Sequence, residues 1–126
     1  MSIEPLGSGS RMRQLGPYTM HSDPGHGWLG VPFEDVYLLG IGNDLSPYSY
    51  MSADGKTLYL EEDSDYYKFA RAWKVMVLEA QRQLRARLVG KEEHTNDYSF
   101  IRNLEPLDWT QCLIKYSERL REVTNE

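Results

Sequence analysis

The chain has 126 residues, 40% of them hydrophobic, and a formal net charge of -5 at pH 7. This length fits one domain with a modest core. The acidic balance disfavours free affinity for nucleic acid or anionic membranes, but it permits binding to a basic protein surface. No apolar run is long enough to span a bilayer, so we expect no membrane association. The single cysteine, Cys112, excludes an internal disulfide and favours a cytoplasmic location.

Residues 1–16 are expected to form a flexible tail. Within them, Gly7-Ser8-Gly9-Ser10 has the composition of a linker. Two short strands are then predicted, at 18–20 and 28–31. Between them lies Asp23-Pro24-Gly25, whose residue types favour a turn.

A short helix is predicted after the second strand. Pro32 suits a first helical turn because its ring fixes one backbone dihedral and its missing N–H would be unpaired there anyway. Phe33, Val36 and Tyr37 then recur at helical spacing. Gly40 provides a C-terminal stop.

The clearest local signal is a β-hairpin. Asp54-Gly55 is a preferred two-residue hairpin turn. Pairing outward from this turn sets Met51 opposite Leu58 on one face and Tyr50 opposite Tyr59 on the other. We expect the first face to belong to the core and the second to be a tyrosine-bearing surface or a second packed layer.

Two longer helices are predicted in the second half of the chain. The first, about 64–89, begins at an acidic N-terminus and ends at Gly90. The second, about 108–123, opens on a pattern like a capping box and carries an apolar stripe that includes Cys112. A strand is predicted between them at 98–102. The stripe of the last helix, which ends near Val123, leaves a homodimer open.

These elements predict a single α+β domain over 17–126. We expect a small, mostly antiparallel sheet of three to five strands, packed on one face by two or three helices.

The segment 21–28 is the leading candidate for a ligand or metal site, because it concentrates side chains that ligate metals. His21, Asp23 and His26 are the candidate ligands, and a transition metal would need one more, from His94, Glu61, Glu62 or Asp63. Their spacing matches no established zinc motif. The alternative is a structural turn, fixed by the proline and glycines among them.

A second candidate surface combines tyrosines with the acidic run 61–65. Tyrosine favours interfaces, and a negative patch suits a basic partner. The alternatives are that the tyrosines pack under a helix and that the acids stabilise a helix N-terminus. The candidate partner-binding residues are Tyr48, Tyr50, Tyr59, Glu61, Glu62, Asp63 and Asp65.

A basic stripe along the longest helix suggests contact with phosphate or RNA, although such a stripe is more often a solvated helix face. It comprises Arg71, Lys74, Arg82 and Arg85, with Arg87 and Lys91 nearby. The sequence contains no phosphate-binding loop, dinucleotide fingerprint, Cys-x-x-Cys pair or Gly-x-Ser-x-Gly elbow. This lowers the expectation of an enzyme.

The segment 22–41, with Asp-Pro-Gly-His-Gly-Trp-Leu, resembles a group of small proteins from bacteria, phages and plasmids. The resemblance continues at Ser49-Tyr50 and 59–65, and more weakly at 99–102. It implies a compact α+β core and an accessory role, but no mechanism. The longer central helix and the added C-terminal helix depart from the group, which puts any shared partner in doubt.

The leading functional prediction is a non-enzymatic accessory protein of phage or plasmid type. It would bind and modulate a host protein complex with a basic surface, such as a defence or gene-expression machine, without a cofactor. One alternative is a small metal-dependent hydrolase or nuclease that uses a divalent transition metal on His21, Asp23 and His26. Another is a nucleic-acid-binding regulator that acts through the basic helix.

Overall fold

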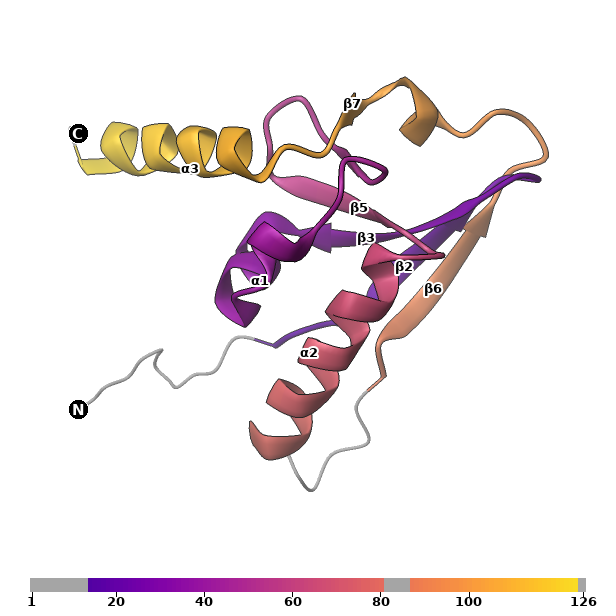
Figure 1. Cartoon of the computed structure of the whole chain (residues 1–126), viewed down its shortest axis with the longest axis horizontal. Helices are drawn as coiled ribbons and strands as arrows, with labels where there is room; N and C mark the ends of the chain where they lie inside the picture. Colours follow the sequence, from indigo (N-terminus) through magenta and orange to yellow (C-terminus); the bar gives the residue numbers. More distant parts are fainter. Residues whose placement is uncertain (1–13, 81–86, 125–126) are drawn as a thin grey trace.

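The computed structural model describes residues 14–80 and 87–124, which form an α+β fold with one six-stranded mixed sheet (Figure 1). The strands are β2 (Tyr18–Ser22), β3 (Gly27–Pro32), β4 (Tyr50–Met51), β5 (Thr57–Glu61), β6 (Val89–His94) and β7 (Glu105–Pro106). The α-helices described are α1 (Phe33–Leu39), α2 (Asp65–Ala80) and α3 (Trp109–Thr124). Two short 3-10 helices, η1 (Gly42–Asp44) and η2 (Phe100–Asn103), complete these elements.

The sheet has the strand order β6-β2-β3-β5-β4-β7. Its pairings are antiparallel except that between β2 and β6, which is parallel. The α+β class is therefore confirmed, but the sheet has more strands than the predicted three to five. Two strands were not predicted, the two-residue β7 and β6. Strand β6 is an edge strand whose residues from Gly90 onward are exposed, so it carries no hydrophobic alternation.

The long helix ends earlier than predicted. Helix α2 begins at Asp65, close to the predicted start, but Val89 belongs to strand β6 instead of the predicted helix 64–89. Its neighbour Leu88 accepts a hydrogen bond from the backbone N–H of Tyr18 (2.7 Å), so pairing with β2 replaces helical bonding here. Residues 81–86, and with them the predicted helix positions Arg82, Leu84 and Arg85, lie outside the described residues.

The segment 98–102, predicted as a strand, instead contains η2. Ser99 has extended backbone angles, and its side chain accepts a hydrogen bond from the N–H of Ile101, which starts the 3-10 turn. Ile101 is fully buried. The alternation of polar and apolar residues therefore reflects one buried anchor in a loop and not a strand.

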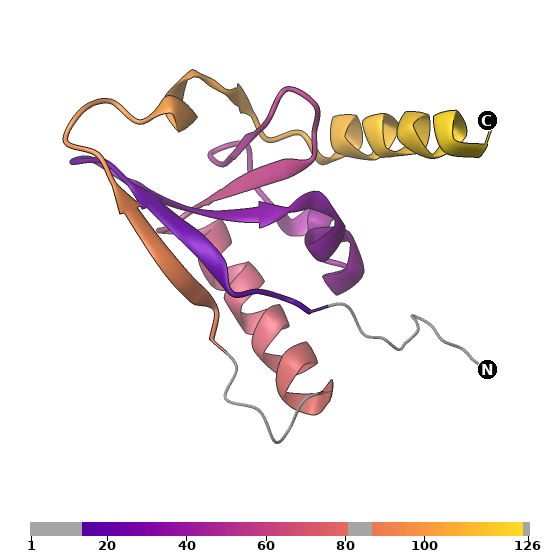
Figure 2. The same cartoon turned by 180° about the vertical axis from the view of Figure 1, so that it is seen from behind.

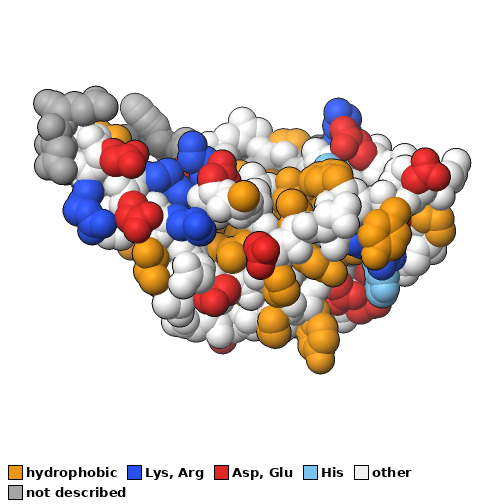
Figure 3. Space-filling model, turned by 90° about the horizontal axis from the view of Figure 1, so that it is seen from above, with side chains coloured by type: hydrophobic (Ala, Val, Ile, Leu, Met, Phe, Trp, Pro, Cys, Tyr) orange, Lys and Arg blue, Asp and Glu red, His pale blue; other side chains and the backbone are white. Residues whose placement is uncertain are grey.

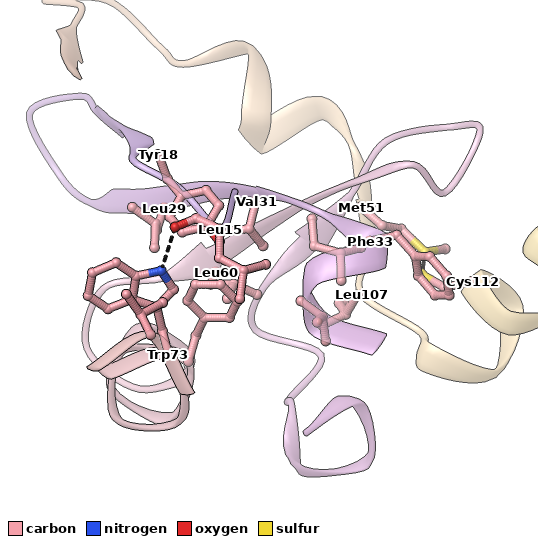
Figure 4. Close-up of a cluster of buried hydrophobic side chains, with 14 residues drawn as sticks. Leu15, Tyr18, Leu29, Val31, Phe33, Met51, Leu60, Trp73, Leu107 and Cys112 are labelled. Atoms are coloured by element: carbon pink, nitrogen blue, oxygen red, sulfur yellow. Dashed lines mark hydrogen bonds between the residues drawn. The ribbon is translucent and has the colours of Figure 1, made fainter. Parts of the chain in front are cut away.

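The core lies between the sheet and the helices α1 and α2, which cover one sheet face (Figures 1 and 2). Alternate residues of β3 and β5, such as Leu29 and Leu60, point toward Phe69 and Trp73 of α2. Leu15, predicted to lie in a flexible tail, is buried, and its carbonyl accepts a hydrogen bond from Trp73 Nε1 (3.0 Å; Figure 4). The remaining part of the predicted tail, residues 1–13, lies outside the described residues.

The predicted hairpin register is confirmed. Strands β4 and β5 pair Tyr50 with Tyr59 and Met51 with Leu58. Gly55 has a φ of 73°, a left-handed conformation that favours glycine. The turn itself differs from the predicted two-residue turn at Asp54-Gly55, because the N–H of Gly55 donates to the carbonyl of Ser52 and the N–H of Ser52 donates to the carbonyl of Thr57, both at 2.9 Å. The register is nevertheless the predicted one, and it places Tyr50 and Tyr59 on the same face.

Helix α3 packs on the rest of the fold mainly through its first two turns, and Arg119 in the third turn donates from Nη1 to the carbonyl of Asp54 (2.9 Å). Trp109 stacks on Phe33 with ring centroids 4.9 Å apart, and Cys112 is buried with its Sγ 3.6 Å from Met51 Sδ. Burial raises the pKa of the Cys112 thiol to about 11, so the thiol behaves as a small core residue. The distal half projects away from the sheet and exposes Val123 (Figures 1 and 2), so the homodimer stays a prediction.

Within residues 14–80 and 87–124, no helix combines the length and the apolar character that crossing a membrane requires.

Gly42 fixes how α3 meets the rest of the fold. A side chain at this buried position would overlap the indole ring of Trp109. We expect Gly42→Ala to lower the free energy of unfolding by about 1–3 kcal/mol, because the rigid ring must shift out of its packed position. Urea unfolding checks this prediction. The matched control is Gly40→Asn, which adds a side chain where no atom lies within 4 Å and where asparagine tolerates the positive φ. Equal losses in both variants would contradict the packing argument.

Candidate functional site

The candidate site lies on the sheet face opposite the α2 core. Strand register places five of its residues on this second face. His21 pairs with Trp28, and Trp28 pairs with Glu61. Tyr50 pairs with Tyr59, which lies two residues from Glu61 on β5 and so shares its face. The loop that contains η2 returns over the same face, since His21 and Tyr59 both contact Phe100. Figure 3 shows hydrophobic side chains on the upper side of the molecule next to histidine and acidic side chains.

Asp23 joins the β2–β3 turn to the η2 loop. Its Oδ1 accepts hydrogen bonds from the backbone N–H groups of Gly25 and His26, both at 3.0 Å. Its Oδ2 accepts a bond from the N–H of Ser99 (3.1 Å). The guanidinium of Arg102 donates to both oxygens, from Nε at 2.6 Å and from Nη2 at 3.0 Å. The carboxylate is therefore fully occupied and only 2% exposed.

These bonds favour the charged form of Asp23 and hold the pKa of its carboxyl well below the ordinary value of 3.8, chiefly through Arg102. Asp23 therefore has a structural role. The predicted metal-ligand set of His21, Asp23 and His26 stays a prediction, and a metal bound there would have to displace Arg102 from Asp23.

The two histidines of segment 21–28, His21 in β2 and His26 in the turn, have different surroundings. His21 packs edge-on against Tyr59 (5.6 Å between centroids) and Phe100 (5.7 Å), and burial lowers the pKa of its imidazole. His26 is exposed, and its Nδ1 lies 3.9 Å from an oxygen of Glu61. Only His26 therefore remains beside the acidic run.

A pocket of about 410 Å³ brings together residues from the predicted metal site and from the predicted partner-binding surface. His26 lies in the turn between β2 and β3, and Glu61 lies at the end of β5. Tyr48 lies in the loop before the hairpin, and Tyr50 lies in its first strand, β4. The lining residues are His26, Trp28, Tyr48, Tyr50, Glu61, Ser64 and Arg102. The structure thus assembles four of the predicted candidates in one hollow.

Four predicted partner-binding residues, Tyr59, Glu62, Asp63 and Asp65, lie outside this pocket's lining. Tyr59 is half-buried, packs on His21 and Phe100, and has a raised phenol pKa because of its burial. Glu62 is half-buried, and its backbone N–H donates to the carbonyl of Gly27. Asp63 is exposed and lies close to His26 and Glu61.

Asp65, the remaining acidic candidate, is fully buried at the start of α2. Its Oδ2 accepts hydrogen bonds from the backbone and side chain of Ser46 and from the hydroxyl of Ser49. Its Oδ1 pairs with Lys68 at 3.2 Å. Asp65 is therefore not a contact residue. Instead, it anchors the loop that carries Tyr48.

Arg102 and Trp28 are site residues that the sequence reasoning missed. The Arg102 guanidinium lies 5.5 Å from the Trp28 ring centroid and 5.0 Å from that of Tyr98. Trp28 also contacts His26 (6.0 Å) and Tyr50 (6.2 Å). No local sequence pattern indicates a role for Arg102, because its partner Asp23 is 79 positions away in the sequence.

Only part of the basic stripe predicted for nucleic-acid binding, Arg71 and Lys74, lies within the described residues. Lys91 lies in β6 and pairs with Glu93 at 2.8 Å. Arg71 and Lys74 are exposed on α2, while Arg82 and Arg85 lie outside the described residues. The nucleic-acid alternative therefore stays a prediction.

No family model matches the chain, and no similar curated protein or solved structure was found. The resemblance to small accessory proteins therefore stays a prediction, and function has to be argued from the site itself.

Asp23 predicts a specific pH dependence of stability. A carboxylate with a lowered pKa stabilises the folded state above its unfolded pKa, and that stability is lost as the pH falls through the folded pKa. We expect Asp23→Asn to be less stable than the parent at about pH 7 and the gap to narrow below about pH 4. Urea unfolding across this range checks it. The exposed Asp63 supplies the control Asp63→Asn, for which we expect little change. A gap that stayed constant down to about pH 2 would contradict the role of the Asp23 charge.

Proposed function

We propose that this chain is a non-enzymatic binding protein whose pocket receives a cationic side chain of a partner protein. The observation that carries the proposal is the pairing of Tyr48, 75% exposed at the pocket wall, with Glu61 inside the same pocket. An exposed aromatic ring beside a carboxylate suits an arginine or lysine side chain, which gains from both the ring face and the charge.

The local charge favours a cation. Arg102 contributes a positive charge to the pocket, but Asp23 compensates it at 2.6 Å. Glu61 and Asp63 then leave a net negative charge beside the half-buried aromatic wall. Because the pocket is partly screened from water, that charge acts more strongly there than on an open surface.

The aromatic wall is held in position before any partner arrives. Trp28 is 2% exposed and contacts Tyr50, so its ring cannot reorient freely. Asp65 anchors the loop that carries Tyr48 through two serines. A prearranged wall lowers the entropy cost of binding, which supports a recognition role.

The partner that we propose is a host protein complex with a basic surface, with the chain acting as an accessory modulator of phage or plasmid type. The acidic net charge and the sequence resemblance support this choice. The hydrolase alternative loses support because Asp23 is bound to Arg102 and His21 is packed between aromatic rings.

Substitution of Tyr48 tests the proposal. Short peptides that centre on arginine, lysine or glutamine would be titrated into labelled protein and followed by NMR. We expect arginine and lysine peptides to shift the pocket residues, and Tyr48→Ala to weaken that binding about tenfold.

Tyr67→Ala is the matched control, because Tyr67 is also exposed (58%) but lies on α2, outside the lining of this pocket. Equal binding of the glutamine peptide, or equal losses in both tyrosine variants, would overturn the proposed cationic specificity.

A further inference from the structure

We infer that His26, Glu61 and Asp63 form a binding site for a divalent transition-metal ion. Each residue offers one ligand atom, and the three atoms all lie within 4.8 Å of one another. His26 comes from the β2–β3 turn, and Glu61 and Asp63 come from the stretch between the end of β5 and α2, so the fold brings two separate segments together here.

The distances suit a metal after small adjustments. Metal–nitrogen and metal–oxygen bonds of about 2.0–2.2 Å place tetrahedral ligand atoms roughly 3.4 Å apart. His26 Nδ1 and Glu61 Oε2 are already 3.9 Å apart. His26 and Asp63 are exposed side chains, so a rotamer change that closes the remaining gap meets little packing resistance.

Neighbouring groups orient two of the ligands. The hydroxyl of Ser64 donates to Glu61 Oε1 at 3.0 Å, which leaves Oε2 on the side of His26. The backbone N–H of His26 is fixed by Asp23 at 3.0 Å. Hydrogen bonds of this kind, one shell away from a metal, hold ligands in a binding geometry.

The donor set indicates the class of ion. One imidazole and two carboxylates offset the charge of a divalent cation, and imidazole favours Zn²⁺, Co²⁺ or Ni²⁺ over Mg²⁺ and Ca²⁺. Three protein ligands leave at least one coordination position for water or another donor. His26 and Glu61 both line the pocket, so that position would open toward Tyr48 and Tyr50.

This inference rests on ligand geometry and not on the proposed partner. The two are connected, however, because a bound ion would take up the negative charge of Glu61 and Asp63. Metal and a cationic side chain are therefore expected to compete for the pocket.

The test is calorimetric titration of untagged, metal-free protein with Zn²⁺, with Co²⁺ absorption as a second readout of coordination. We expect one ion per chain, and at least tenfold weaker binding in His26→Ala and in Asp63→Asn. Asp63 is exposed, so that variant keeps the test valid if the histidine variant folds poorly.

His94→Ala is the matched control. His94 is another exposed histidine, bonded to Ser22 and Asn96 outside this cluster, so its loss should leave the affinity unchanged. Tyr48→Ala should also keep metal binding, which separates failure of this inference from failure of the proposed function. The absence of stoichiometric binding in the parent protein, or an equal loss in His94→Ala, would overturn the inference.

Discussion

The carboxylate of Asp23 joins two segments that lie 79 positions apart, and the candidate site is built around that junction. Arg102 pairs with it through two nitrogens, while Ser99 and the turn donate backbone N–H groups. The same guanidinium lies over Trp28, so the ion pair also forms one side of the pocket. Removing either partner would leave the other charge without compensation in a region that is mostly screened from water. The charged pair therefore has a structural role, and recognition is left to the residues around it.

The parts of the fold that follow from local chemistry could be predicted. Asp54-Gly55 correctly predicts the position and the register of the hairpin, and Gly40 ends α1 in a left-handed conformation. Strand β6 could not be predicted, because its exposed residues lack alternation and its parallel pairing with β2 depends on contacts about 70 positions apart. For the same reason the predicted helix ran on to Val89, since helical periodicity says nothing about a competing strand partner.

The sequence identified most of the site's side chains but not their grouping. His26 was predicted as a metal ligand, whereas Tyr48, Tyr50 and Glu61 were predicted as partner-binding residues, and all four converge in one pocket. Other predicted site residues have packing or anchoring roles instead. His21 and Tyr59 pack against Phe100. The buried carboxylates of Asp23 and Asp65 each fix a loop through hydrogen bonds. Residue type alone cannot separate a carboxylate that binds a ligand from one that binds the backbone. The difference lies in which N–H groups the fold brings within 3 Å or so.

Hydrogen–deuterium exchange of individual amides tests the central claim most directly. If Asp23 is the junction, the amides of Gly25, His26 and Ser99 are protected in the parent protein, because all three donate to its carboxylate. Arg102→Gln should then speed exchange at all three amides. It should leave the exchange rates of the amides that hydrogen-bond between strands β3 and β5 unchanged. Fast exchange at these amides in the parent protein, or a change confined to the neighbours of position 102, would contradict the account.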